Sequence, residues 1–102
     1  MGARDHFLAV EAPSEDHEFG GEVVTIRGLT AAGRDRFEIA LAGGESFRPA
    51  LARATVFLGD EPLFEDDDNL SAIPVRVLEP VIDIAVRLSA LTAGEMEELE
   101  GN

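Results

Sequence analysis

The sequence lacks several residue types on which whole classes of protein depend. Its 102 residues include no Cys, Trp or Tyr, and all eight basic residues are Arg because Lys is absent. Without Cys there is no disulfide framework, no thiolate metal site and no cysteine nucleophile. The eight basic residues face 21 Asp and Glu, which gives a formal net charge of −13. A chain this acidic has no basic stripe to neutralise phosphates, so we expect neither nucleic acid nor an anionic membrane surface as a partner.

The chain does have enough apolar residues for one folded domain. They make up 45% of the sequence, which is too many for wholesale disorder despite the acidity. No apolar run approaches the ~20 residues of a membrane span. The segment from Met1 to His6 lacks the charged-then-apolar order of a secretory signal. We therefore expect a cytoplasmic protein.

The N-terminal residues predict an arm followed by a hairpin. Residues 1–19 mix a short apolar stretch with an acidic one, and we assign them to an arm that ends in a candidate first hairpin strand. Gly20-Gly21 is typical of a turn. After it, Val24 and Ile26 alternate with polar residues, which predicts a half-buried strand. One hairpin is all the β-structure that we expect, and residues 20–102 form the predicted helical domain.

The middle of the chain predicts two helices with clear start and stop signals. Thr30 is the expected N-cap of the first, which ends at Gly43-Gly44. Ser46 is the expected cap of the second, over residues 47–58. Apolar residues in this second segment recur at the i, i+3, i+4, i+7 spacing of a stripe that faces a core.

A short helix and a long one are predicted next. The carboxylates that precede Leu70 suit the positive end of a helix dipole and favour a short helix over residues 67–72. Pro74 is the expected first residue of a long helix that runs to about Ser89. Pro80 lies inside this segment and should kink or split it.

The C-terminal residues predict a last short helix. Thr92 and Glu95 have the spacing of a capping box, which opens a helix over residues 93–100. The predicted fold is therefore mainly α (α+β), a small domain of about four to five helices with one N-terminal β-hairpin.

The sequence offers no support for catalysis. The acidic residues from Asp60 to Asp68 lack the alternating ligands and the glycine of a calcium loop, and a solvated run at a helix start explains them. His6 and His17 are isolated in the arm, where no packed shell would hold a metal ligand or a general base. We expect a protein that is not an enzyme, with no metal and no cofactor.

The chain's apolar helices and its acidity each allow two interpretations. The segments over residues 47–58 and 74–91 offer more apolar surface area than a chain of about 100 residues can easily bury. They form either an ordinary core or a groove that holds a partner helix or another copy of the chain. The negative charge either keeps such a domain soluble or mimics DNA toward a basic enzyme.

Three stretches resemble one known family, the tail assembly chaperones of long-tailed (siphovirus-type) bacteriophages and prophages. The matching stretches are Val24 to Thr30 with Arg34 to Glu38, Asp60 to Asp68, and Ile73 to Thr92 with Glu97 to Glu100. They are similar to the family's strand and first helix, its Asp-rich turn with a Leu-Phe pair, and its proline-started long helix with an acidic terminal helix. Gly33 stands where the family tends to have Glu, and Pro80 interrupts the long helix.

The resemblance implies a specific role in virion assembly. It implies a chaperone that binds the tape measure protein in the host cytoplasm, keeps it soluble while the tail tube polymerises, and is absent from the mature virion. It also implies a longer form made by a frameshift near residues 98–102, whose added segment recruits tail tube protein. A homo-oligomer stays open.

Six apolar residues are the predicted partner contacts of such a chaperone. They are Phe47, Leu51, Phe57, Phe64, Leu78 and Val81. Two other classes of function are alternatives: a structural head–tail or tail component that stays in the particle, and an acidic inhibitor that mimics DNA.

Overall fold

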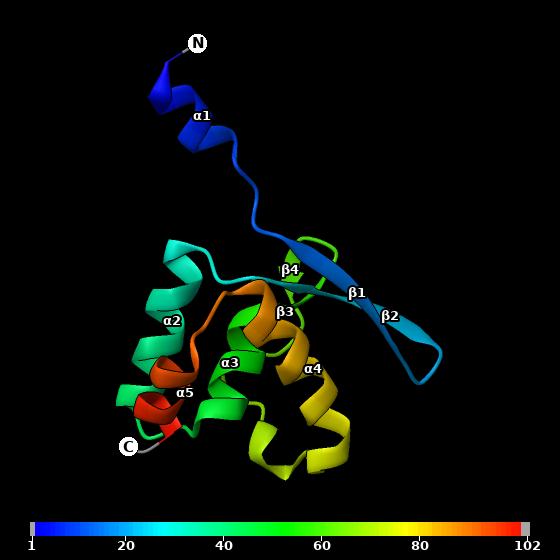
Figure 1. Cartoon of the computed structure of the whole chain (residues 1–102). Coiled ribbons are helices and arrows are strands. Elements are labelled where there is room, and N and C mark those ends of the chain that lie inside the picture. The colour runs from blue at the N-terminus through cyan, green and yellow to red at the C-terminus, as the bar shows by residue number, and fades with distance from the viewer. Residues whose placement is uncertain (1, 101–102) are drawn as a thin grey trace.

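The computed structural model describes residues 2–100, apart from the side chains of residues 93, 99 and 100. These residues form an α+β domain with five α-helices and a four-stranded antiparallel sheet (Figure 1). In chain order, the elements are α1 (Ala3–Ala9), β1 (Ser14–Phe19), β2 (Glu22–Arg27), α2 (Ala31–Ala42), α3 (Phe47–Thr55), β3 (Val56–Leu58), β4 (Glu61–Pro62), the 3₁₀ turn η1 (Leu70–Ala72), α4 (Val75–Leu88) and α5 (Ala93–Glu100). The predicted fold class is confirmed.

The N-terminal hairpin forms where the sequence predicts it. β1 pairs with β2 in antiparallel register, with His17 opposite Val24 and Phe19 opposite Glu22. The two residues between the strands, Gly20 and Gly21, have φ angles of 64° and 83°. A two-residue turn whose central residues both have positive φ matches the right-handed twist of the strands, and glycine adopts it without steric cost.

A second hairpin corrects the prediction of a single one. The helix predicted over residues 47–58 ends at Thr55, and the chain continues directly into β3, which pairs with both β2 and β4. The residues from Thr55 to Leu58 are β-branched, aromatic or leucine, and they fit a strand as well as a helix face. Gly59, with φ of 65°, starts the turn into β4. The apolar residues with helical spacing therefore continue to residue 58, although the helix ends at Thr55.

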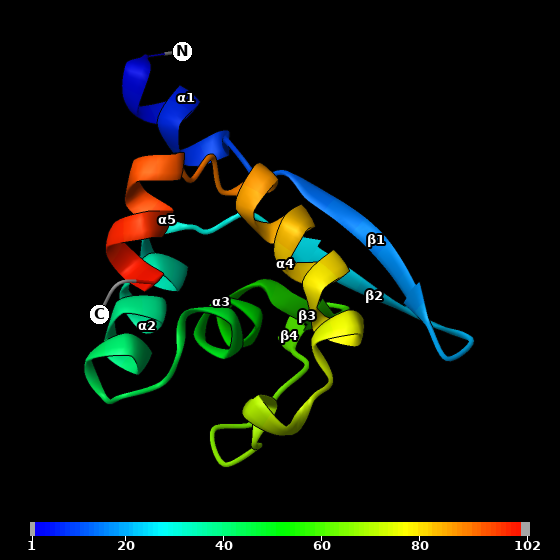
Figure 2. The same cartoon turned by 60° about the horizontal axis from the view of Figure 1, so that its bottom comes forward.

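Helix α3 lies at the centre of the helical layer. It packs against α2 on one side and α4 on the other, and α4 also lies against β1 and β2 (Figures 1 and 2). Seven of its nine residues are buried. Thr55 is the buried polar residue among them, and its hydroxyl donates to the carbonyl of Leu51 at 2.7 Å. The hydroxyl therefore keeps a hydrogen-bond partner although it is buried.

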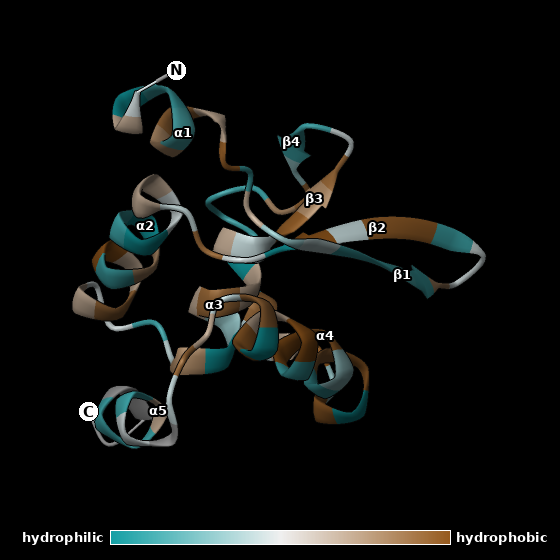
Figure 3. Ribbon diagram, turned by 45° about the horizontal axis from the view of Figure 1, so that its top comes forward, coloured by the Kyte–Doolittle hydropathy of each residue, from teal (hydrophilic) through white to brown (hydrophobic). Residues whose placement is uncertain are grey.

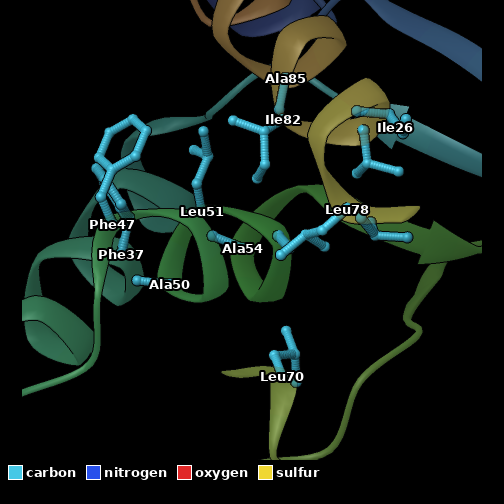
Figure 4. Close-up of a cluster of buried hydrophobic side chains, with 13 residues drawn as sticks. Ile26, Phe37, Phe47, Ala50, Leu51, Ala54, Leu70, Leu78, Ile82 and Ala85 are labelled. Atoms are coloured by element: carbon cyan, nitrogen blue, oxygen red, sulfur yellow. The ribbon is translucent and has the colours of Figure 1, made fainter. Parts of the chain in front are cut away.

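The core joins side chains from every part of the central body. Ile26 of β2, Phe37 of α2, Leu51 of α3 and Ala85 of α4 are fully buried (Figure 4). The rings of Phe37 and Phe47 meet edge to face, with centroids 5.8 Å apart. This arrangement places the positive edge of one ring on the negative face of the other.

The helix caps follow the sequence signals closely. The hydroxyl of Thr30 accepts from the backbone N–H of Gly33 at 3.0 Å, and that of Thr92 accepts from the N–H of Glu95 at 3.1 Å. Gly43 ends α2 as predicted. Ser46 occupies the N-cap position of α3, but its side chain makes no capping hydrogen bond.

Two predictions about the segment from residue 67 to residue 89 need correction. The short helix over 67–72 contracts to the 3₁₀ turn η1. Of the two effects predicted for Pro80, a kink or a split, the split does not occur: α4 runs without interruption from Val75 to Leu88 after Pro74 as N-cap. Proline removes one N–H and crowds the preceding turn, and packing of α4 on both α3 and the sheet offsets that cost. Within residues 2–100, no helix has the length and apolar character needed to cross a membrane.

Helix α1 stands away from the rest of the molecule. It has no buried residue, and it projects beyond the sheet at the end of a short linker (Figure 1). The side chains of Phe7, Leu8 and Val10 are 82%, 69% and 77% exposed. Within residues 2–19 the structure therefore has the candidate first hairpin strand as β1, and the arm before it contains a helix that the sequence analysis did not predict.

At Gly28 the backbone that follows β2 lies very close to the backbone at the end of α4. A Cβ atom at this position would meet the carbonyl group of Leu88, with the carbonyl carbon at 2.9 Å. The neighbouring Leu29 N–H donates to the hydroxyl of Ser89 at 2.9 Å. The end of β2 and the end of α4 are thus held together where only glycine fits.

Gly28→Ala should therefore lower the free energy of unfolding by about 1–3 kcal/mol, because the two backbones must separate. Urea denaturation measures this. The matched control is Gly94→Ala, where the new Cβ meets nothing closer than the Thr92 hydroxyl at 4.0 Å. Helix propensity makes that change stabilising by about 0.5 kcal/mol. Equal effects of the two variants would contradict the close approach.

Candidate protein-binding groove

An apolar groove of about 400 Å³ opens between the hairpin, β3 and the start of α4. Its walls come from three parts of the chain: the N-terminal hairpin, residues 56–64 and residues 73–81. The lining residues are His17, Phe19, Glu22, Val24, Val56, Leu58, Leu63, Phe64, Ile73, Pro74, Val77, Leu78 and Val81. Figure 3 shows the corresponding hydrophobic segments along β2, β3 and α4.

The strands present apolar side chains to the groove by simple alternation. In β3, Val56 and Leu58 line the groove while Phe57 between them does not. This follows from the two-residue period of a strand. Phe19 and Leu58 are 60% and 58% exposed, so the groove has large apolar groups that the chain itself does not cover.

Arg53 anchors the loop that supplies one wall. Its guanidinium donates to both carboxylate oxygens of Glu45, at 3.1 and 2.8 Å, and to the backbone carbonyls of Glu65 and Asp68, at 2.5 and 2.9 Å. Hydrogen bonding to Glu45 raises the pKa of Arg53, so the cation persists at any ordinary pH. The side chains of Arg53 and Glu45 are only 18% and 21% exposed. The loop that follows Leu63 and Phe64 is therefore fixed by a half-buried, charge-assisted cluster.

Helix α4 forms the floor of the groove. Leu78 and Val81 are buried at 7% and 9% exposure, and Val77 is half-buried beside them. Pro74, the N-cap of α4, is a lining residue that is exposed. The floor is thus continuous with the core, and its outer rim remains open to solvent.

The lining of the groove is suited to binding apolar side chains. His17 and Glu22 are its titratable lining residues, and both come from the hairpin. No serine or threonine lies beside them in the lining to act as a nucleophile. A concave apolar surface with a few polar groups at one side is typical of a site for a helix or a peptide.

The structure brings three of the six predicted contact residues to the groove. Phe64, Leu78 and Val81 line it. Leu51 and Phe47 belong to the core, at 0% and 5% exposure, so a partner could not touch them without opening the domain. These two are structural residues in the folded chain.

Phe57 lies on the opposite face of the sheet from the groove. The guanidinium of Arg27 sits 4.5 Å from the centre of its ring, and also donates to Gly59 O at 2.7 Å and to Asp60 at 3.1 Å. A cation over an aromatic ring is attracted by its negative face. Phe57 is therefore covered by the chain's own arginine and lies outside the groove.

Sequence reasoning missed the most exposed groove residues. Phe19, Leu58 and Leu63 lie at strand ends or beside a turn. Leu58 ends the predicted helical stripe over residues 47–58, and the other two belong to no stripe. The available signal was the sequence from Leu58 to Leu63, two apolar residues around Gly-Asp-Glu-Pro, which is typical of a hairpin. The helical spacing assigned to residues 47–58 hid it.

The acidic loop beside the groove brings three carboxylates together. Oxygen atoms of Glu65, Asp67 and Asp68 lie within 4.8 Å of one another, and all three residues are exposed. Asp68 accepts from the N–H of Glu65 at 2.7 Å. The Asp68 carboxylate therefore stabilises the turn over residues 65–68 by accepting this backbone hydrogen bond.

Comparisons with protein families, with curated proteins and with solved structures find no match for this chain.

The Arg53 cluster generates a stability prediction. Arg53→Lys keeps the charge but cannot bridge a carboxylate and two carbonyls at once, so we expect about 1–2 kcal/mol of lost stability. Hydrogen exchange in residues 63–69 should become faster. Arg48→Lys is the control, because its pair with Glu79 at 2.8 Å is 43% and 37% exposed. An exposed pair of this kind contributes at most about 1 kcal/mol. Unchanged exchange in Arg53→Lys would contradict the anchoring role.

Proposed function

We propose that this protein is a tail assembly chaperone of a long-tailed phage or prophage, which binds the tape measure protein and keeps it soluble in the host cytoplasm. The observation that carries the proposal is the apolar groove of about 400 Å³, with Phe19 and Leu58 left more than half exposed in it. A holdase needs apolar surface that is accessible before the partner arrives, and an ordinary closed core offers none.

The shape of the groove favours a helical partner. A wall of strands faces the N-terminal turns of α4 across it, and alternate strand residues point inward. An amphipathic helix would insert side chains spaced by three and four residues between those walls. The tape measure segments expected from the family resemblance are of this kind.

The charge distribution supports the same role. The groove is almost uncharged, whereas the whole chain carries −13. A surface of high net charge around a bound apolar segment keeps the complex dispersed by mutual repulsion. The same charge repels DNA in the cell where the particle is assembled. In a longer frameshifted form, the added segment would recruit tail tube protein.

Co-expression with the tape measure protein of the same genome tests the proposal. The wild-type chain should raise the soluble yield of that protein and remain bound to it in a pull-down. Leu58→Asp and Phe19→Asp place a carboxylate in the groove, and each should reduce the rescued yield severalfold because a charge must then lose its hydration on binding. Circular dichroism establishes that each variant is folded.

Ile39→Asp is the matched control for these variants. Ile39 is an exposed apolar residue of α2, at 71%, and it lies outside the groove. It should rescue the tape measure protein as well as the wild type does. Loss of rescue in all three variants, or in none, would contradict binding through the groove. Presence of the chain in purified particles would instead indicate a structural tail component.

A further inference from the structure

Strand β1 is the outer strand of the sheet, and one of its two edges faces no other strand. The strand order is β1-β2-β3-β4, so β2 covers only the inner edge of β1 (Figures 1 and 2). Strand β3 pairs with β2 only at Thr25 and Ile26. The hairpin beyond that point, toward Gly20 and Gly21, is a ribbon of two strands. Such a ribbon is only marginally stable by itself, and a third strand stabilises it.

The alternation of hydrogen bonds in the hairpin identifies which backbone groups of β1 are free. The N–H of Gly28 donates to the carbonyl of Pro13 at 2.8 Å, so these two residues form a hydrogen-bonded pair. In an antiparallel ladder, such pairs alternate with pairs that exchange no hydrogen bond. The register therefore directs the backbone N–H and C=O groups of Ser14, Asp16 and Glu18 away from β2. Within residues 2–100, no other segment bonds to these groups.

The side chains beside these free backbone groups are acidic. Asp16 and Glu18 are exposed. They lie on the face of the sheet opposite the groove, because strand residues alternate and His17 and Phe19 line the groove. Asp16 accepts from the hydroxyl of Thr25 at 3.3 Å, and Glu18 forms no ion pair among the described residues. A strand that pairs with this edge therefore places two of its residues directly opposite two carboxylates that no cation neutralises.

Charge selects which strand can occupy this edge. The two antiparallel registers that overlap most of β1 with β1 of a second copy put Asp16 opposite either Asp16 or Glu18 of that copy. Like charges directly opposite each other destabilise a strand pair, whereas opposite charges stabilise it. The net charge of −13 acts in the same direction, because it repels another copy and attracts a cationic segment. A second copy is therefore disfavoured, and a basic strand fits.

We propose that the free edge of β1 binds an extended basic segment of another protein, which adds a fifth, antiparallel strand to the four-stranded sheet. Two Arg or Lys side chains, separated by one residue, lie opposite Asp16 and Glu18. Main-chain hydrogen bonds to Ser14, Asp16 and Glu18 supply the affinity, and the two charge pairs supply the selectivity. The added strand lies beyond His17 and Phe19, so it extends that wall of the groove and leaves the groove itself open.

A capped peptide, Thr-Val-Arg-Val-Arg-Val-Thr, tests the strand addition by titration into the isotope-labelled full chain. Amide hydrogen exchange at Asp16 and Glu18 should slow by about tenfold or more on binding, because their N–H groups gain partners. The amide of His17 is directed toward Val24 of β2 and is bonded in both states, so its exchange should change less.

Two N-methylated forms of this peptide separate strand addition from simple attraction of a cation to an acidic chain. Both forms keep both arginine charges. Methylation of the two arginine backbone nitrogens removes the N–H groups that face β1, so binding should weaken by about tenfold or more. Methylation of two valine nitrogens removes N–H groups that face away from β1, so binding should persist.

Asp16→Lys combined with Glu18→Lys reverses the charge of the edge without changing a groove residue. This double variant should lose the arginine peptide and bind the matched peptide that has Glu in place of Arg. Asp35→Lys combined with Glu97→Lys is the control, because these two carboxylates are exposed on α2 and α5 and the change in net charge is the same. The control should still bind the arginine peptide. Circular dichroism establishes that both double variants are folded.

Three results would overturn the proposal: equal binding of the two methylated peptides, equal loss of binding in the two double variants, and a wild-type dimer whose Asp16 and Glu18 amides are already protected. The last result would indicate that a second copy occupies the edge. None of these measurements uses the tape measure protein, so their failure is separate from failure of the proposed function. The variant with Asp16→Lys and Glu18→Lys keeps the groove, and it should still rescue the tape measure protein on co-expression.

Discussion

The burial of α3 is the constraint on which the rest of the structure depends. Seven of its nine residues are covered, by α2 on one side and α4 on the other. Its last residue, Thr55, is followed without any connecting residue by β3, so the position of the helix fixes the position of a strand in the sheet. The groove lies where β3, continuing beyond the end of α3, faces the first turns of α4, and Leu58 at the end of β3 stays more than half exposed there.

Much of the fold could be predicted from the sequence because its signals are local. The glycine pair at the first hairpin, the hydroxyl at Thr30, the glycines that stop α2 and the box at Thr92 each act within one turn of chain. Local signals of this kind survive tertiary packing, and the structure places each of them as expected. The family resemblance concerns function, and no relative was found that bears on it.

The candidate site was harder to predict because it depends on which apolar side chains stay accessible after the helices and the sheet have packed together. Leu51 and Leu78 have the same apolar character, yet one is inside the core and the other lines the groove floor. Phe57 is separated from the groove only by strand alternation, and the assumption of a helix at that point placed it on the wrong side. Leu58 was a member of the same stripe, and only its strand conformation makes it a groove residue.

The direct passage from α3 into β3 also sets an order of events in folding. Ile26 pairs with Val56, thirty positions along the chain, and the two helices α2 and α3 lie between them. Closing so long a loop from an open coil costs more entropy than closing it after the helices have shortened it. We therefore expect the helical pair to form before the central strands meet, and the groove, which also needs residues 73–81, to be completed late in synthesis.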